Sequence, residues 1–480
     1  MNNTPKLQIL FLIFIILLLV FTKLRQHPIE AWDEARNGVS AIEMLTNGDW
    51  INPYYKGEPD DWVAKPPLAI WCIAGSFSLF HFNEFALRLP AAIAIIIAFF
   101  FIFKIIRLYK STDFAFYTLL ILSSVNGLIG WHVGRTGDTD ALLICFLIAG
   151  LYHFLRFYDF GKSKAIYWTG LLWGLAFMVK GPAMGVLLPG LLLYIVFSGG
   201  WKKVLYTKNT WLAVAIAAIF PVAWFLIIHF YGVTFENNSA GDNVVERLFI
   251  YDLWERFTEN EAGWKKAFSF HFFFYSLDKL FNLWNYIFFK FLAVGTFLLI
   301  KNWQKWKSYL LATPQKLLFL SLCLYFPLAI FLTLAAKSHS WYLAPAIPFV
   351  GIVTYFSITI LMEKNRWIFP IFIALLCFTI GRKFYDFYTP NEKPTIITEH
   401  WQSLAEAEKI AILGSVEQDI LLYIYFANRH IYFPKKPNDL RKATVVFVNN
   451  SFLDNFKFQH SKIIEKTERY TILAVDNFKR

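Results

Sequence analysis

The feature that most constrains this chain is a series of about eleven apolar runs, each long enough, or nearly long enough, to cross a bilayer. They lie near residues 7–21, 85–103, 113–131, 141–155, 165–179, 183–198, 211–231, 281–300, 317–336, 341–361 and 367–381. Of the 480 residues, 57% are hydrophobic and only 17% are charged, against about 25% charged in soluble domains. The sequence therefore predicts an α-helical polytopic membrane protein with about 11 transmembrane helices, within a range of about 10–13.

Three of the apolar runs need a decision about their boundaries. The run at 7–21 is followed by Lys23, Leu24 and Arg25 and by no small-residue cleavage site, so we expect a retained first transmembrane helix rather than a signal peptide. Only Lys180-Gly181-Pro182 separates 165–179 from 183–198. This pair is predicted to be two helices with a tight turn or one broken helix.

Basic residues in alternate loops orient the predicted bundle. If the N-terminus lies in the cytoplasm, the loops on the cytoplasmic side of the membrane contain most of the basic residues between the spans. These are Lys104, Arg107, Lys110, Arg156, Lys162, Lys164, Lys202, Lys203, Lys208, Lys301, Lys305, Lys307, Lys316, Lys364 and Arg366. This is the positive-inside pattern, and it explains the formal net charge of +12 without a nucleic-acid partner. We expect a multi-pass protein of the inner (cytoplasmic) membrane with an external, periplasmic C-terminus.

The first external loop, residues 24–84, carries an unusual amount of charge. The acid pair Asp33-Glu34 lies near its start, and Lys65 precedes a double proline near its end. The spacing of Ala35, Val39 and Ile42 predicts a short amphipathic helix that lies in the plane of the membrane interface. The apolar piece 68–80 is predicted to be a second interfacial helix or part of an uncounted span.

The composition becomes more polar after Tyr385. Residues 386–480 are predicted to form a small external α/β domain, with helices at 398–409 and 416–427 and strands at 410–413, 443–448 and 470–475. Residues 1–385 form the transmembrane domain in this division, which includes a long external loop at 232–278. The C-terminal domain contains no catalytic motif, so a structural or acceptor-handling role is expected for it.

Three of the four candidate acids of the external loops have two interpretations each. Asp33 is either the N-cap of the following helix or a general base that accepts a proton from an attacking group, and Glu34 favours the helix N-terminus electrostatically. Asp138 and Asp140 either cap the next helix or pair with Arg135 or Lys65. A metal site is conceivable in the Asp-Thr-Asp sequence, but no standard ligand spacing is present, so no metal or other cofactor is expected to be required.

Four external cations, Lys65, Arg135, Arg256 and Lys337, run against the positive-inside trend. Fixed positive charge beside an apolar bundle suits an anionic ligand, and arginine matches phosphate geometry well. The alternative for each is an ion pair with a nearby acid, and Lys65 has the further alternative of a snorkelling side chain. His271 and His339 are interpreted as interfacial histidines rather than metal ligands.

Several motifs resemble the C-type glycosyltransferases, in particular the aminoarabinose transferases and protein O-mannosyltransferases. DEARNGVSAIEMLTNGDWINPYYKGEP followed by AKPPLAIW is similar to the first external loop of this family. NEFALRLPAAI, GRTGDTDALL, KGPAMGVLLPGLL and KSHSWYLAPAIP follow in the same order as in the family. Together these motifs cover roughly residues 30–350. One segment departs from the family pattern. After the position that corresponds to Arg256, relatives often carry a His-Gly-Pro-type motif, whereas this chain has Glu261-Ala262-Gly263-Trp264.

The resemblance implies a C-type fold and transfer of a sugar from a polyprenyl monophosphate, without an essential metal and with inversion. It implies that Asp33 is the catalytic carboxylate, that Asp140 assists or orients, and that Lys65 binds the donor phosphate. Residues similar to those of the phosphate region are Arg256, Lys337 and Tyr342, and Arg135, Glu34, Asp138 and His339 complete the candidate set. The acceptor is expected to be a lipid A-like glycolipid, another glycan or a protein, and the enzyme a monomer.

Two other functions remain open at this stage. A lipid-linked sugar flippase would have charged residues in mid-helix and inverted repeats; Lys290 is the main candidate for such a charge, and no repeat is evident. An oligosaccharide ligase or polymerase would use a diphosphate-linked donor. A purely structural membrane protein would not need the loop from Asp33 to Lys65.

Overall fold

The computed structural model describes residues 4–60, 65–130, 132–233, 248–250, 255, 270–301, 310–335, 337–428, 430–435, 440, 443–455 and 461–475. The chain divides into two compact units. The helical unit contains Met1–Leu24, Ala64–Ala69 and Pro90–Thr389. The mixed unit contains Arg25–Val63, Ile70–Leu89 and Pro390–Arg480, so it joins the first loop to the C-terminal region that the sequence assigned to a separate domain.

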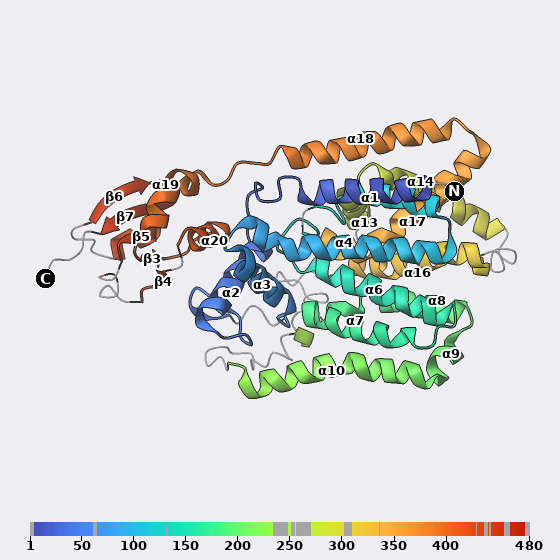
Figure 1. Ribbon diagram of the computed structural model, residues 1–480, viewed down its shortest axis with the longest axis horizontal. Helices are drawn as coiled ribbons and strands as arrows, with labels where there is room; N and C mark the ends of the chain where they lie inside the picture. Colours follow the sequence, from blue (N-terminus) through green and yellow to red (C-terminus); the bar gives the residue numbers. More distant parts are fainter. Residues whose placement is uncertain are drawn as a thin grey trace. The chain divides into compact units, whose positions relative to one another are not determined.

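The helical unit is a bundle of apolar helices that run beside one another (Figure 1). Its elements are α1 (Thr4–Phe21), α4 (Glu84–Tyr109, which starts in the mixed unit), α5 (Thr112–Ser123), α6 (Asp140–Tyr158), α7 (Ala165–Lys180), η1 (Gly181–Gly185), α8 (Leu188–Phe197), α9 (Trp201–Tyr206), α10 (Lys208–Tyr231), α13 (Phe270–Phe281), α14 (Trp284–Lys301), α16 (Thr313–Leu334), η3 (Ser340–Ala346), α17 (Ile347–Lys364) and α18 (Ile368–Tyr388). Contacts link α6 to α7, α7 to α10, and α16 to both α8 and α17.

Six helices in the described ranges are long and apolar enough to cross a membrane. They are Glu84–Tyr109, Asp140–Tyr158, Lys208–Tyr231, Gln315–Leu334, Ser340–Lys364 and Ile368–Tyr388. This confirms a multi-pass membrane protein. The number of eleven spans stays a prediction, because Pro5–Phe21, Leu68–Phe80 and Thr112–Ser123 are shorter apolar helices.

The ambiguous region around Lys180 consists of two helical pieces, Ala165–Gly185 and Leu188–Phe197, bent by 72°. The break begins at Gly181, whose φ of 55° is one that residues with a Cβ rarely adopt. Pro182 then removes a backbone donor, which disfavours a continuous helix through this point. Counted as one broken span, the pair raises the number of candidate spans to seven.

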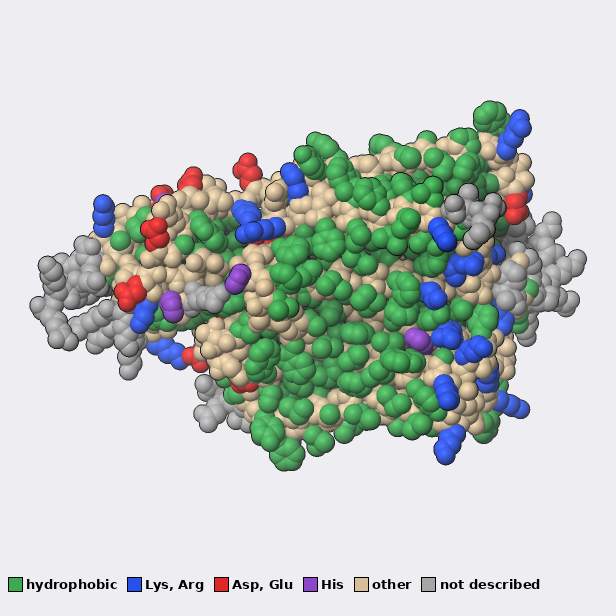
Figure 2. Space-filling model, viewed as in Figure 1, with side chains coloured by type: hydrophobic (Ala, Val, Ile, Leu, Met, Phe, Trp, Pro, Cys, Tyr) green, Lys and Arg blue, Asp and Glu red, His purple; other side chains and the backbone are tan. Residues whose placement is uncertain are grey.

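Small residues allow α7 and α10 to approach closely. A Cβ added at Gly170 would lie 2.2 Å from the carbonyl oxygen of Ala213, and one added at Gly174 would lie 2.2 Å from the ring of Phe220. Close contact through glycine is typical of helix pairs in membranes. The other side of α10 exposes apolar side chains such as Trp211 and Phe230, and apolar side chains cover much of the helical unit in Figure 2. These surfaces suit contact with lipid.

The mixed unit contains a five-stranded sheet with strand order β4-β3-β5-β7-β6. Its strands are β3 (Ile410–Leu413), β4 (Ile431–Tyr432), β5 (Val445–Asn449), β6 (Ser461–Lys466) and β7 (Tyr470–Val475), and helices α19 (Thr395–Glu406), α20 (Gln418–Ala427) and η5 (Asn450–Asn455) accompany them. β3 pairs in parallel with β4 and β5, whereas β7 is antiparallel to β5 and β6. The predicted small α/β region is confirmed, and β4 and β6 are strands that the sequence analysis missed.

Two helices and a short hairpin from the first loop complete this unit. They are α2 (Asp33–Asn47), α3 (Leu68–Phe80), β1 (Tyr54–Tyr55) and β2 (Glu58–Pro59). The stripe of Ala35, Val39 and Ile42 is at most 1% exposed, and it shares one hydrophobic core with Leu421 and Leu422 of α20. Protein therefore covers this stripe, and the position of α2 in the plane of the membrane interface stays a prediction. Periodicity marks an apolar face, but it does not say whether lipid or protein covers that face.

Candidate active site

The candidate residues are divided between the two units, and Asp33 belongs to the mixed unit. Asp33 is the first residue of α2, while the N-cap position is occupied by Trp32. No side-chain capping hydrogen bond is formed there, so the N-cap interpretation of Asp33 was wrong. Asp33 is exposed, and its charge is favourable beside the N–H groups of the first helical turn.

The turn before Asp33 has an uncommon backbone conformation. Trp32 has φ 72° and ψ −112°, a region that costs a bulky residue free energy unless its surroundings hold it there. Those surroundings come from Glu34, whose Oε2 accepts a hydrogen bond of 2.8 Å from the N–H of Glu30. The neighbour of Asp33 is therefore part of the structure that shapes the approach to α2.

Glu34 is paired with Arg88 at the start of α4. The Arg88 Nε and Nη2 atoms donate hydrogen bonds of 2.6 and 2.8 Å to the two carboxylate oxygens. Arg88 also donates to the carbonyls of His27 (3.0 Å) and Pro28 (2.8 Å). Both charged side chains are 1% exposed. Arg88 lies in the motif NEFALRLPAAI, but nothing in that motif indicates its pairing with Glu34.

The C-terminal helix α20 holds α2 by polar contacts as well as by its core. The Tyr425 hydroxyl donates a 2.5 Å hydrogen bond to Glu43, and the Gly57 N–H donates one of 3.0 Å to the other carboxylate oxygen. Burial, the largest effect, raises the pKa of Glu43, although both hydrogen bonds act in the opposite direction. The Tyr423 hydroxyl accepts a 2.9 Å bond from the Ile29 N–H. The C-terminal region thus supports the loop that carries Asp33.

In the helical unit, Asp140 is paired with a residue that the sequence analysis did not select. The Lys180 Nζ lies 2.7 Å from both carboxylate oxygens of Asp140, which is 4% exposed. The same amine lies 5.5 Å from the ring centroid of Tyr342. Thr139, not Asp140, occupies the N-cap position of α6. The capping interpretation of Asp140 and its predicted pairing with Arg135 or Lys65 were wrong; an ion pair with Lys180 replaces both.

A stack of three rings lies beside Asp138. His132 stacks on Trp341 with centroids 3.9 Å apart, and Trp341 stacks on His339 with centroids 4.3 Å apart. Tyr342 meets His339 edge to face at 5.4 Å. The Nδ1 of His132 lies 2.9 Å from the Asp138 carboxylate. Among the described residues of this unit, Asp138 and His132 could supply two ligands to a divalent metal, although a protein site usually supplies three or four.

Arg135 is buried, at 6% exposed, and it binds the end of α1. Its guanidinium donates hydrogen bonds of 2.7 Å to each of three carbonyls, those of Leu19, Val20 and Thr22. The guanidinium also lies 3.9 Å from the ring centroid of Phe387 in α18. These contacts give Arg135 a structural role that the sequence did not suggest, and its predicted contact with a donor phosphate stays a prediction.

The remaining candidates occupy positions near helix ends of the helical unit. Lys65 is half-buried and lies three residues before α3, and Lys337 lies three residues before η3, which contains Tyr342. Arg256 and the segment from Glu261 to Trp264 fall outside the described residues. The predicted role of Arg256 in phosphate binding therefore stays a prediction.

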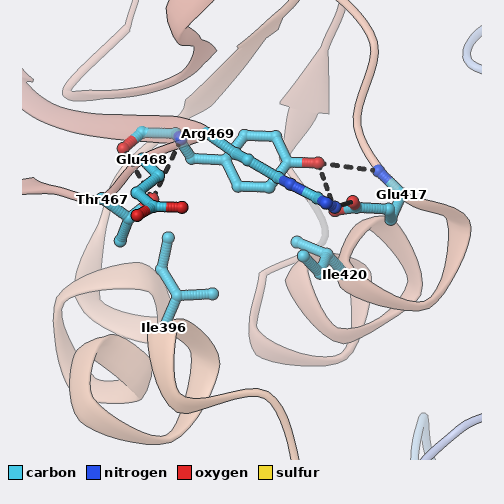
Figure 3. A pocket seen from close by; sticks show the side chains of 7 residues that line it. Ile396, Glu417, Ile420, Thr467, Glu468 and Arg469 are labelled. Atoms are coloured by element: carbon cyan, nitrogen blue, oxygen red, sulfur yellow. Dashed lines mark hydrogen bonds and ion pairs between the residues drawn. The ribbon is translucent and has the colours of Figure 1, made fainter.

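A shallow pocket in the mixed unit lies apart from these candidates in the chain (Figure 3). Its apolar side chains come from Ile396 and Ile420. The other lining residues are Glu417, Thr467, Glu468, Arg469 and Tyr470. The Arg469 guanidinium donates a 2.6 Å hydrogen bond to Glu417, and the Tyr470 hydroxyl also bonds to that carboxylate. Because Arg469 and Tyr470 both bond to Glu417, we interpret the pocket as a structural connection between α20 and the β6–β7 turn.

Comparison with known proteins gives the same family of folds that the motifs suggested. The dolichyl-phosphate-mannose-protein mannosyltransferase family matches residues 64–227. The structure of ArnT from Cupriavidus metallidurans bound to undecaprenyl phosphate aligns with a TM-score of 0.69, at 14% identity and 97% coverage of both chains. An oligosaccharyltransferase of Archaeoglobus fulgidus aligns with a TM-score of 0.53, at 10% identity, over 94% of this chain and 70% of that one.

This chain has the C-type glycosyltransferase fold. Among sequence relatives, the undecaprenyl phosphate-alpha-4-amino-4-deoxy-L-arabinose arabinosyl transferase of Enterobacter sp. (strain 638) is 27% identical over 271 residues, 54% of this chain and 46% of the relative. The corresponding protein of Aeromonas salmonicida is 27% identical over 263 residues, 52% of this chain and 46% of the relative. The chain thus spans about half the length of the curated relatives it matches. The predicted resemblance to aminoarabinose transferases and O-mannosyltransferases is confirmed.

Proposed function

We propose that this protein transfers a sugar from a polyprenyl-monophosphate donor to an acceptor of the cell envelope, with Asp33 as the base. The observation that carries the proposal is the position of Asp33. It is an exposed carboxylate at the first turn of α2, and it follows directly on a turn held by the buried Glu34–Arg88 pair. Such a fixed position is what a general base requires.

The proposed reaction requires two kinds of group, a base for the acceptor and positive charge for the departing phosphate. A lipid phosphate is a good leaving group, so no general acid is needed, but the acceptor hydroxyl or phosphate must lose a proton as it attacks. Asp33 supplies the base, and attack on the face opposite the phosphate gives inversion. Positive charge must stabilise the departing phosphate, and we assign this role to Lys65, Lys337 and Arg256, with Tyr342 as a further ligand of the phosphate.

Asp140 takes part through Lys180. The ion pair holds the amine over the ring of Tyr342, so Asp140 orients a cation beside a residue of the proposed phosphate region. In this proposal Asp140 is a positioning residue, because its own carboxylate oxygens are occupied by the amine. Of the two roles that the resemblance implied for Asp140, assisting or orienting, the proposal takes the second.

The distribution of charge supports an external reaction. Basic side chains gather at the end of the helical unit where the N-terminus lies in Figure 1, as Figure 2 shows. Two lysines of the loops predicted to be cytoplasmic lie close together, because Lys203 donates to the carbonyl of Tyr158 and Lys316 donates to the neighbouring Asp159. By the positive-inside rule, Asp140, Lys180 and Tyr342 then lie toward the external face, and the protein belongs to the inner membrane.

The test is mass spectrometry of envelope lipids, glycans and glycoproteins from cells with and without the protein. We expect the loss of one sugar from one acceptor, restored by the natural chain and not by Asp33→Asn, which should lower the transfer rate by about 10²–10⁴-fold. Asp113→Asn is a matched control, because Asp113 also lies in the first turn of a helix, α5. Normal transfer by Asp33→Asn at normal membrane levels would exclude the assignment. An unchanged envelope with accumulated donor on one face would favour a flippase.

A further inference from the structure

Two basic side chains from neighbouring helices flank one tyrosine ring at the basic end of the helical unit. The Lys104 amine of α4 lies 5.9 Å from the ring centroid of Tyr152. The Arg156 guanidinium, which belongs to α6 like the tyrosine, lies 5.7 Å from the same centroid. Both basic side chains are half-buried, and in the described part of the chain neither has an ion pair or a side-chain hydrogen bond. An anion is the partner that this arrangement lacks.

The acid nearest to Arg156 in sequence is Asp159, and it is bound elsewhere. Its Oδ1 accepts a 3.0 Å hydrogen bond from Lys316. Its Oδ2 accepts hydrogen bonds of 2.6 and 2.7 Å from the hydroxyls of Tyr109 and Tyr194. Asp159 therefore connects α6 to α4, α8 and α16, and the positive charge that it compensates is that of Lys316.

Aromatic side chains from three helices surround the two cations. The ring of His153 lies 5.1 Å from that of Tyr152, 6.1 Å from that of Phe101 in α4 and 6.0 Å from that of Trp168 in α7, measured between centroids. Neither imidazole nitrogen has a hydrogen-bond partner among the described residues. Trp168 is 55% exposed. Tryptophan is enriched where proteins meet the headgroup region of a membrane, so this ring places the cluster at that depth.

The cluster lies within about two helical turns of one end of the bundle. Lys104 is five residues before the end of α4, and Arg156 is two residues before the end of α6. Figure 2 shows basic side chains gathered at this end, next to a broad apolar surface. Asp140 begins α6 at the other end, about 24 Å away along the helix axis. The inference that follows therefore goes beyond the proposed function and does not depend on it.

We propose that Lys104, Arg156 and His153 bind the phosphate group of an anionic phospholipid. The lipid belongs to the leaflet at this end of the bundle, which the positive-inside rule makes the cytoplasmic one. Basic pockets between membrane helices on that side are a known means of recognising lipid headgroups. The phosphate supplies the missing negative charge, and its oxygens accept hydrogen bonds from the guanidinium, the amine and the imidazole. The lipid thereby connects α4 to α6.

The surface beside Lys104 favours a lipid over a soluble anion. Ile97 and Phe100 are 40% and 56% exposed. They lie seven and four residues before Lys104, so the three side chains share one face of α4. An exposed apolar face that leads away from a cation suits an acyl chain below its headgroup. A free phosphate ion would make no use of it.

Two double variants separate a built site from the general attraction of basic residues for anionic lipid. Lys104→Gln with Arg156→Gln changes the proposed site, and Lys162→Gln with Lys164→Gln removes two exposed charges from the following loop. Native mass spectrometry of the full-length protein measures the binding constant of the first phosphatidylglycerol, with phosphatidylcholine of the same chain length as reference. We expect binding of phosphatidylglycerol to weaken about tenfold in the first variant and less than about twofold in the second. Equal losses in both variants, or no loss in the first, would overturn the proposal.

The natural chain gives an independent measurement that does not depend on the folding of a variant. In nanodiscs, replacing part of the phosphatidylcholine by phosphatidylglycerol should slow acetylation of Lys104 about threefold or more relative to that of Lys162. An unchanged ratio of the two rates would contradict the site. Inorganic phosphate added to pure phosphatidylcholine nanodiscs should give no such protection, and equal protection by it would overturn the assignment to a lipid. The Asp33→Asn protein should bind phosphatidylglycerol as the natural chain does.

Discussion

Arg88 at the start of α4 and Glu34 at the start of α2 form a buried, two-bond ion pair across 54 residues of sequence. The remaining guanidinium N–H groups bind the carbonyls of His27 and Pro28, so the pair fixes the segment that leads into Asp33. The cost of burying the two charges is offset only because both partners are present. Removal of one partner leaves the other charged, buried and without compensation.

We expect Glu34→Gln and Arg88→Met each to lower the free energy of unfolding by about 3–5 kcal/mol. The double variant should lose less than the sum of the two, because no unpaired charge remains in it. Thermal unfolding of the purified protein in detergent measures these effects. Additive losses would show that the two side chains do not act as a pair.

Lys180→Met should leave the Asp140 carboxylate buried without its cation. The free energy of unfolding is expected to fall by about 1–3 kcal/mol, and transfer activity should fall with it. Asp140→Asn combined with Lys180→Met removes the uncompensated charge and should recover stability but not activity. Lys164→Met, a change at an exposed lysine, is the control. Recovery of full activity in the double variant would exclude a role of this pair in the reaction.

Arg135→Lys tests whether the guanidinium fork is needed at the end of α1. A lysine ammonium cannot reproduce the planar arrangement of donors that reaches the carbonyls of Leu19, Val20 and Thr22. We expect a loss of about 1–3 kcal/mol in stability. Arg107→Lys, at an exposed arginine bonded to one carbonyl, should have little effect. The same variants, assayed for donor binding, test the predicted phosphate contact: a weaker donor affinity specific to Arg135→Lys would support it.

Tyr425→Phe should make the free energy of unfolding depend more strongly on pH than it does in the natural chain, because of Glu43. Because the folded-state pKa of Glu43 is raised by burial, the contribution of this group is present below its unfolded pKa and lost as pH rises through the folded one. Loss of the Tyr425 bond destabilises the charged carboxylate and raises the folded pKa further. The variant should therefore lose more stability at pH 8, about 1–3 kcal/mol, than at pH 4.5.

Thermal unfolding at the two pH values measures this difference. Tyr423→Phe is the matched control, because its hydroxyl accepts a bond from the Ile29 N–H rather than donating to an acid. The loss in this control should be similar at both pH values. Equal losses for Tyr425→Phe at pH 4.5 and pH 8 would show that the Glu43 carboxylate does not depend on this hydroxyl.

The candidate site illustrates which contacts a sequence can and cannot reveal. The order of motifs predicted the C-type fold and selected Asp33, Lys65 and Asp140, since each motif is a local property of the chain. The partners of these motifs come from distant segments. Nothing near Asp140 in sequence indicates Lys180, 40 residues away, and Glu34 gives no sign of Arg88. Tertiary packing brings these charges together, and their burial then makes the pairing obligatory.

By itself, the sequence determined that this is a multi-pass membrane protein, because long apolar runs have few other stable environments, and it located the charged loop before the second membrane-spanning segment. Only the tertiary structure decided what that loop rests on. The stripe of Ala35, Val39 and Ile42 packs against α20, more than 370 residues away, and not against lipid. An apolar stripe lowers its free energy by leaving water for any apolar partner, so its period predicts burial, and only the fold determines the partner.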